Sequence, residues 1–274
     1  MYRYNTGSNQ SGYRSNSPLT NDEIMAYAPS VMAEAPHESR GDRYAFIPTI
    51  NVLDGLRNAG FQPFEVRQTK CRDLNKREFT RHLVRMRHPD AIATQSEVPE
   101  IVLLNSHDGT SSYQLLAGIF RMVCSNGMIA GDVCNDIRIR HSGNVVDDVI
   151  EGSFTVLDNL NDVTERIDTY KALPLLPEEQ MVLANAAIGL RWGDSAPVTA
   201  NEVLRPRRWE DHKDDLWTVS NRLQESLIRG GNLGRNATGR RVRTRAITGV
   251  NEDVKLNRAL WSITDHFAKM KLAA

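Results

Sequence analysis

The chain has 274 residues, 40% hydrophobic and 25% charged, and a formal net charge of zero. This is the composition of an ordinary globular protein with one large or two modest domains, and it excludes a global basic bias toward nucleic acid. No membrane-spanning apolar run and no secretory signal are visible, so we expect a cytoplasmic protein without membrane contact. The three cysteines lack CxxC spacing, which favours reduced thiols.

The N-terminal segment changes character sharply near residue 19. Residues 1–18 are rich in Ser, Asn, Gly and Tyr, so we expect a disordered tail. Thr20 and Glu23 then form a capping box for a short helix, which Pro29 prevents from continuing. The segment "PTINVLDGLRNAG" predicts a second helix that buries three side chains and ends at a glycine: Val52, Leu53, Leu56 and Gly60.

Alternating residues after this helix predict a β-hairpin. The segment "FQPFEVRQTKCRDLNKREFTRHLVRMRH" has an apolar set on one face and turns around residues 73–77. The opposite face carries polar and cationic side chains: Arg67, Thr69, Arg81, Arg85 and Arg87. Either this face is a solvated outer surface, or it is a cationic surface that binds a polyanion.

The segment "IVLLNSHDGTSSYQLLAGIFRMVCSNGM" places a polar cluster between two apolar elements. We expect a strand over 98–104, a loop over 105–111 and a helix over 112–125, followed by one or two strands that include Ile137 and Ile139. The buried positions of the predicted helix are Leu115, Leu116, Ile119, Phe120 and Val123.

A loop that feeds a helix start is a typical anion site, because free N–H groups and the helix dipole point at it. The hydroxyl groups of Thr110, Ser111 and Ser112 add donors. Alternatively, the serines cap the helix and Asp108 forms a turn. His107 and Asp108 are also weak candidates for catalytic groups of a hydrolase.

The sequence predicts neither a cofactor nor a metal. The nucleotide-binding patterns GxxxxGK[ST] and GxGxxG are absent, so no cofactor is expected. A metal cluster of Cys124, Cys134 and His141 is conceivable, but it lacks the close ligand pairs of zinc sites, so no metal site is predicted.

Helical patterns dominate the second half of the chain. One helix starts at Pro177 and stops at Gly193, and a second carries an apolar stripe through "DDLWTVSNRLQESLIRGG". Asn251 is expected to cap the last helix. The expected buried stripe of that helix is Leu256, Leu260, Ile263, Phe267 and Met270. The predicted fold class is therefore α+β, with an N-terminal antiparallel-rich sheet and helices over 19–155 and a helical region over 156–274.

The segment "RGGNLGRNATGRRVRTRAITG" carries the strongest functional signal. Six arginines and no acid lie between Arg229 and Arg245, and the glycines predict a flexible arginine-rich loop over 229–249. Its phosphate-binding candidates are Arg235, Arg240, Arg241, Arg243 and Arg245. The alternative is a solvated connector. Nearby, "LRPRRWEDH" contains Trp209, which either stacks on a base or packs in the core.

Several long strings carry a likeness to a known family. "GFQPF", "VPEIVLLNSHDGTSSYQ", "PRRW", "DLWT" and "DVKLNRALW" occur in the order of the YafZ/YfjQ/YubP family of enterobacterial prophage and plasmid proteins, which the chain resembles from about residue 19 to 267. The resemblance to this uncharacterised family implies residence on mobile DNA. It implies no activity and no catalytic residue.

The sequence thus predicts a non-enzymatic accessory protein of a mobile element that binds DNA or RNA through phosphates. A protein-interaction module, such as an inhibitor of a host defence complex, is the alternative partner class. A hydrolase that uses His107 and Asp108 is the third possibility.

Overall fold

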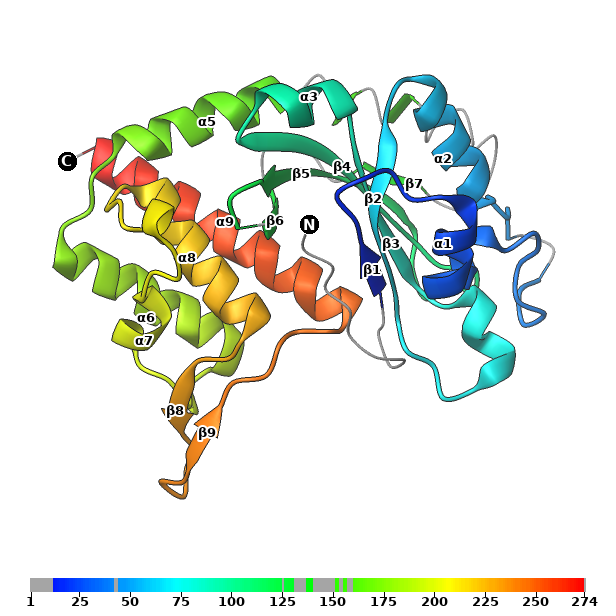
Figure 1. Cartoon of the computed structure of the whole chain (residues 1–274). Coiled ribbons are helices and arrows are strands. Elements are labelled where there is room, and N and C mark those ends of the chain that lie inside the picture. The colour runs from blue at the N-terminus through cyan, green and yellow to red at the C-terminus, as the bar shows by residue number, and fades with distance from the viewer. Residues whose placement is uncertain are drawn as a thin grey trace. The chain divides into compact units, whose positions relative to one another are not determined.

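The structure is a computed structural model that describes residues 12–41, 44–124, 126–130, 137–139, 151–152, 155–156 and 160–273. The chain divides into two compact units. The first contains Met1–Ile119 and Cys134–Leu160, and the second contains Phe120–Val133 and Asn161–Ala274. The first unit combines a sheet with helices and the second is mainly helical, so the predicted α+β fold is confirmed (Figure 1).

The first unit is built on an antiparallel sheet. Its strand order is β1-β2-β3-β4-β5, with β7 paired to the start of β5. β6 follows β5 in the order and belongs, with the last two residues of β5, to the second unit. The strands are β1 (Gly12–Arg14), β2 (Gln62–Gln68), β3 (His82–Arg87), β4 (Glu97–Asn105), β5 (Tyr113–Arg121), β6 (Asn126–Ile129) and β7 (Ile137–Ile139).

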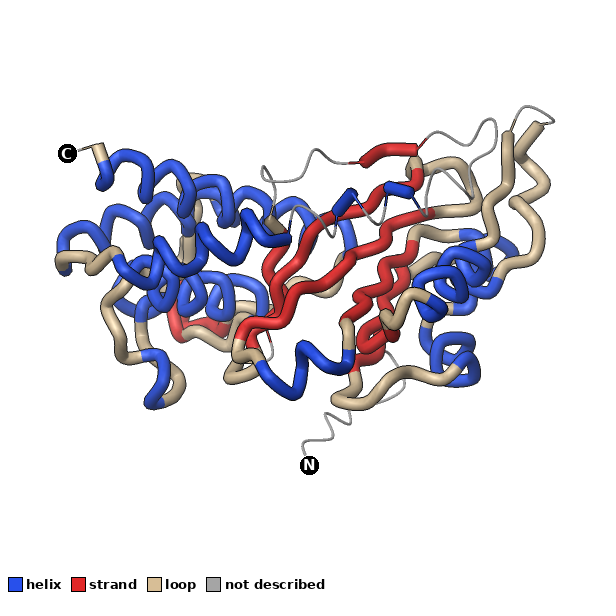
Figure 2. Tube along the Cα trace, turned by 90° about the horizontal axis from the view of Figure 1, so that it is seen from above, coloured by secondary structure: helices blue, strands red, loops and turns tan. Residues whose placement is uncertain are grey.

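Helices cover one face of this sheet (Figure 2). The predicted capping box of α1 is confirmed: Thr20 Oγ1 accepts from Glu23 N at 3.2 Å, and Glu23 Oε2 accepts from Thr20 N at 2.9 Å. The predicted buried face of α2 is also confirmed, and Gly60 follows its end with a φ of +90°. The helices of this unit are α1 (Asn21–Tyr27), α2 (Thr49–Asn58) and α3 (Pro89–Thr94), with short 3-10 turns at η1 (Pro29–Met32) and η2 (Leu74–Phe79).

Two predictions for this unit are wrong. Part of the predicted disordered tail forms β1, where Tyr13 stacks on Tyr27 of α1 with ring centroids 4.5 Å apart; residues 1–11 lie outside the described part. The predicted helix over 112–125 is strand β5 followed by a turn, and Val123 is 42% exposed in that turn. The apolar run "LLAGIF" is buried on both faces of the sheet, and such a run has no period that separates strand from helix.

The second unit is arranged around α8 (Leu216–Arg229), which is buried from Leu216 to Ile228. The predicted apolar stripe of α8 is confirmed, and Trp217 of α8 meets Trp261 of α9 edge-on at 6.4 Å between ring centroids. The remaining elements are α5 (Leu160–Ala172), α6 (Pro177–Trp192), α7 (Ala200–Leu204), η3 (Trp209–Asp211), α8 (Leu216–Arg229), β8 (Leu233–Arg235), β9 (Arg241–Arg243) and α9 (Val250–Leu272).

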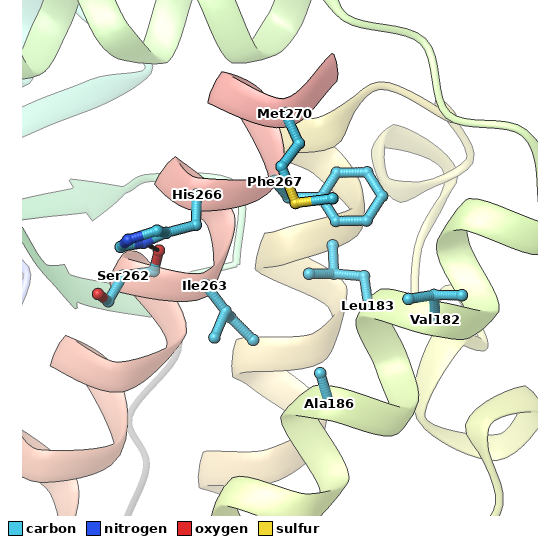
Figure 3. Close-up of a pocket in the computed structure, with 8 residues that line it drawn as sticks. All are labelled: Val182, Leu183, Ala186, Ser262, Ile263, His266, Phe267 and Met270. Carbon is cyan, nitrogen blue, oxygen red and sulfur yellow. Dashed lines mark hydrogen bonds between the residues drawn. The ribbon is translucent and has the colours of Figure 1, made fainter. Parts of the chain in front are cut away.

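Two expectations for α9 are corrected. The helix begins at Val250, so Asn251 lies in its first turn and Gly249 occupies the cap position, because Val250 is already buried in the core. The predicted stripe is buried only in its first half, and Met270 is 71% exposed. Its second half instead lines an apolar groove between α6 and α9 (Figure 3). No helix in the described part of the chain is both long and apolar enough to cross a membrane.

Candidate nucleic-acid interface

The predicted flexible loop contains an ordered two-stranded hairpin. Strands β8 and β9 pair antiparallel, with Arg235 opposite Arg241. The tip is closed by Asn236, whose Oδ1 accepts from Thr238 N at 3.2 Å and from Arg240 N at 2.9 Å. Such an Asx turn replaces the flexibility that the glycines suggested with a defined geometry. We call residues 231–245 the arginine hairpin; it projects from the helices of the second unit (Figure 1).

The base of the arginine hairpin is tied to the helical core. Gly231 N donates to Thr244 O at 2.8 Å, and Thr244 N donates to Asn232 O at 2.9 Å. The side chain of Asn232 is buried and donates to Ser226 O of α8 at 2.9 Å. Because these donors and acceptors are all satisfied, the hairpin is held at a fixed position on its unit.

Opposite faces of the hairpin have different neighbours. Residues that face each other across an antiparallel pair share a side of the ribbon, so Arg235, Arg241 and Arg243 lie on one side and Gly234 on the other. The Gly234 side is pressed against Pro197, because a Cβ atom at Gly234 would lie 1.8 Å from Pro197 O. The arginine side therefore points away from the body of the unit.

Positive charge on this hairpin is not neutralised within the described residues. The hairpin arginines are all exposed, and none has a carboxylate within 4.0 Å there: Arg235, Arg240, Arg241, Arg243 and Arg245. Two of them bond only to nearby carbonyl groups, Arg235 to Gly239 O at 2.8 Å and Arg243 to Gly231 O at 3.3 Å. Like charges directly across a strand pair destabilise it by roughly 0.2–1 kcal/mol, which a bound polyanion would offset.

The sheet arginines behave differently, and the expectation of an exposed cationic face is wrong for two of them. Arg85 and Arg87 are each 2% exposed. Both pair with Glu100 of β4, whose Oε2 is 2.6 Å from Arg85 Nη1 and whose Oε1 is 2.6 Å from Arg87 Nε. The missed signal is Glu100 itself, an acid directly before the apolar run of β4, which a buried arginine must accompany.

A second carboxylate, that of Glu65, forms ion pairs with arginines on the same side of the sheet. It lies 2.5 Å from Arg14 Nη2, 2.8 Å from Arg67 Nε and 3.8 Å from Arg85 Nε. Burial by itself would raise the pKa of Glu65, but the three guanidinium groups outweigh burial and hold that pKa well below its usual range. We call Arg14, Glu65, Arg67, Arg85, Arg87 and Glu100 the buried charge ladder.

The buried charge ladder leaves little of this face for a polyanion. Arg67 is half-buried and already paired with Glu65. Arg81 is also half-buried and donates to the carbonyl oxygen of Thr110. Burial lowers the pKa of Arg81, and the Asp108 carboxylate opposes that shift. A phosphate contact by these arginines would compete with an existing partner, so the arginine hairpin is the better candidate for the interface.

His107 lies inside the first unit rather than on its surface. It and His82 are fully buried, and Thr49 lies between them, with Oγ1 at 2.8 Å from His82 Nε2 and 3.4 Å from His107 Nε2. His82 Nδ1 is 3.3 Å from Thr80 O, so it carries the proton and Nε2 accepts from Thr49. Burial, and then the proximity of His107, lowers the pKa of His82 well below its ordinary value.

Asp108 is directed into its own turn. Its Oδ1 accepts from Thr110 N at 3.0 Å and from Thr110 Oγ1 at 2.6 Å, and Ser111 N donates to Ser106 Oγ at 2.9 Å. Burial would raise the pKa of Asp108, but the Thr110 and Ser106 hydrogen bonds lower it. The turn closes the β4–β5 hairpin, and no helix dipole follows it. Anion binding by Thr110, Ser111 and Ser112 thus loses the helix on which it was predicted.

The hydrolase arrangement gains no support from these positions. A general base must reach the proton that it abstracts, whereas the His107 imidazole is fully enclosed beside Thr49. The Asp108 carboxylate binds Thr110 instead. Of the conceivable metal cluster, Cys124 is a buried thiol, while Cys134 and His141 lie outside the described residues. The arginine hairpin is the remaining candidate surface.

Comparison with known proteins places the chain in a family. A family model described as "Domain of unknown function (DUF932)" matches residues 36–261. The chain belongs to the DUF932 family. It is 51% identical over 253 residues to UPF0380 protein YafZ and to UPF0380 protein YfjQ of Escherichia coli strain K12, with 92% of this chain and of each relative covered. This confirms the resemblance drawn from the sequence strings.

The DUF932 region contains both charged structures described above, since it runs from before α2 into α9. The arginine hairpin and, apart from Arg14, the buried charge ladder therefore lie inside the family's domain. No solved structure matches the chain significantly.

Proposed function

We propose that this DUF932 protein binds nucleic acid through the arginine hairpin, contacting phosphates without reading base identity. The observation that carries the proposal is the outward side of the hairpin, where Arg235 stands opposite Arg241 with no carboxylate close by among the described residues. Guanidinium groups donate two parallel hydrogen bonds to a phosphate, so several of them on one strip can each meet a phosphate of the backbone.

The fixed geometry of the hairpin supports this proposal. Its strands, its Asx turn and its anchored base hold the arginines before any ligand arrives. A pre-organised surface spends less binding free energy on ordering side chains and backbone than a flexible loop does. In this proposal the chain is a cytoplasmic accessory protein, encoded by the kind of mobile element that the family resemblance implies.

Salt-dependent affinity tests the proposal. Binding of fluorescent single- and double-stranded DNA and RNA is measured between low and moderate salt for the wild type and for a variant with five arginine-to-glutamine changes at the hairpin arginines. Each phosphate contact contributes about 0.7–0.9 to the slope of log affinity against log salt, so the variant slope should be shallower by about 3.5–4.5.

A matched control separates local contacts from net charge. It also removes five positive charges, all exposed and outside the hairpin, by glutamine substitution of Lys70, Arg72, Lys76, Arg77 and Lys255. This control should keep most of the wild-type slope. If the wild type binds no nucleic acid at low salt, the proposal fails, and the arginine side then fits an acidic protein partner instead.

A further inference from the structure

The most exposed large apolar side chain in the described residues is Trp209, at 83%. A tryptophan usually packs in a core or an interface, since its ring buries a large apolar area. Trp209 begins the turn η3, in the second unit, and within the described residues its one aromatic contact is with the tilted His212 ring, with centroids 5.5 Å apart. Of the two alternatives for this residue, core packing is therefore wrong.

The turn that presents Trp209 is held by charged hydrogen bonds. Arg208 Nη1 and Nη2 donate to the two Glu225 carboxylate oxygens at 2.8 and 2.7 Å, and Nη1 also donates to Asp211 Oδ2 at 2.7 Å. Asp211 is buried and accepts a further bond from Arg121 at 2.7 Å. A bidentate, partly buried arginine restricts the conformation of the turn strongly, so the backbone that carries the Trp209 indole is rigid.

The same turn is bonded to the base of the arginine hairpin. Arg207, two residues before Trp209, donates through Nη2 to Gly230 O at 2.7 Å and to Asn232 Oδ1 at 3.2 Å. Two residues of chain span about 7 Å at most between their Cα atoms, so Trp209 belongs to the same short segment that Arg207 ties to this base. An exposed aromatic ring and a cationic strip thus share one support.

We infer that Trp209 is a stacking platform for an unpaired base and that the preferred ligand is single-stranded nucleic acid. The inference rests on the nucleic-acid binding proposed above. Proteins that hold single strands combine a cationic track for the backbone with aromatic rings for the bases. A duplex offers no open base face to an indole, because each base is already covered by its neighbours. Arg205 and Arg207, both exposed, add positive charge four and two residues before Trp209 in the chain, and the exposed acid Glu210 follows it.

Alanine substitution of Trp209 tests the inference with an oligo-dT strand and a duplex of equal length. Stacking on one base corresponds to a loss of about 5- to 150-fold in affinity for the single strand. Affinity for the duplex should stay within about twofold. The salt slope should not change, because no phosphate contact is removed. Trp209→Phe should recover much of the loss, and Leu74→Ala, which truncates another highly exposed side chain, should bind as the wild type does.

A fluorescence measurement adds a direct readout. Trp217 and Trp261 are buried, so in a Trp192→Phe background the exposed indole is that of Trp209, and oligo-dT should quench it. The inference is overturned if Trp209→Ala binds the single strand like wild type, or if single strand and duplex weaken equally. If the wild type binds no nucleic acid at all, the proposed function itself is contradicted. If the wild type binds a single strand but Trp209→Ala binds it equally well, only the stacking role of Trp209 is contradicted.

Discussion

Glu100 determines whether the neighbouring arginines of β3 are exposed surface charges or members of a buried ion cluster. Its carboxylate lies between Arg85 and Arg87, and all three are almost completely buried. One fully buried acid in a central strand makes an internal ion cluster of side chains that the sequence pattern presents as exposed cations. The β5 strand leaves room for it at Gly118, where a Cβ atom would lie 3.2 Å from Glu100 Oε2.

Glu100→Gln should destabilise the first unit strongly. The amide keeps the shape but removes the charge that pairs with Arg85 and Arg87, and only Glu65, 3.8 Å from Arg85 Nε, still offsets part of theirs. Breaking a buried pair costs about 3–5 kcal/mol of unfolding free energy. Urea unfolding gives the value. The exposed pair of Arg57 and Asp54, 2.8 Å apart, is the control, and Asp54→Asn should cost less than about 1 kcal/mol. Equal costs would contradict an internal role for Glu100.

At the scale of elements, β8 and β9 depend on close backbone approach. Gly234 lies against Pro197, and Arg235 N donates to Pro197 O at 2.8 Å, so the hairpin is extended sideways by a neighbouring segment. No side chain fits between these backbones. The hairpin can therefore keep its arginine side outward only while position 234 lacks a Cβ atom.

Gly234→Ala should detach the hairpin from this support. The new Cβ atom would lie 1.8 Å from a backbone oxygen, which cannot move aside like a flexible side chain. We expect faster proteolytic cleavage at the hairpin arginines and weaker nucleic-acid binding. The buried tryptophan pair of α8 and α9 should keep its near-ultraviolet circular dichroism signal. Unchanged cleavage would show that the contact does not hold the hairpin.

At the scale of the whole molecule, the net charge is zero, but positive and negative side chains are distributed unevenly along the chain. The first unit uses carboxylates to neutralise its buried arginines, whereas the arginine hairpin has none within ion-pair distance in the described residues. Buried ionisable groups of the first unit should also govern how the stability of the protein depends on pH, because their pKa values differ between the folded and unfolded states.

Stability should fall as the pH decreases below about 6.5. The unfolded chain protonates His82 near its ordinary pKa, but the folded chain resists because that pKa is lowered, so stability drops by up to about 1.4 kcal/mol per pH unit. Below about pH 4.5 the depressed pKa of Glu65 adds to the loss, since its stabilising charge disappears as the pH falls. Urea unfolding from pH 7.5 to 5 measures the first effect, and His82→Gln should flatten it. A level wild-type profile would contradict it.

The sequence alone determined the features that local chemistry controls. The capping box of α1, the buried face of α2, the β2–β3 pairing and the stripe of α8 follow from spacing within a few residues. Long matching strings also indicated the family. The arginine-rich segment was recognisable because its charge and glycine content are local properties that do not depend on contacts with distant residues.

The tertiary structure decided the rest, since burial depends on residues far apart in the chain. The apolar run of β5 matches a strand or a helix until its neighbours are known. Arg85 and Arg87 are neutralised by Glu100, an acid on the adjacent strand. Trp209 stays outside because Arg208 is anchored to Glu225 of α8 and holds the turn at the surface. In each case the free energy of a remote contact, rather than local preference, selected the outcome.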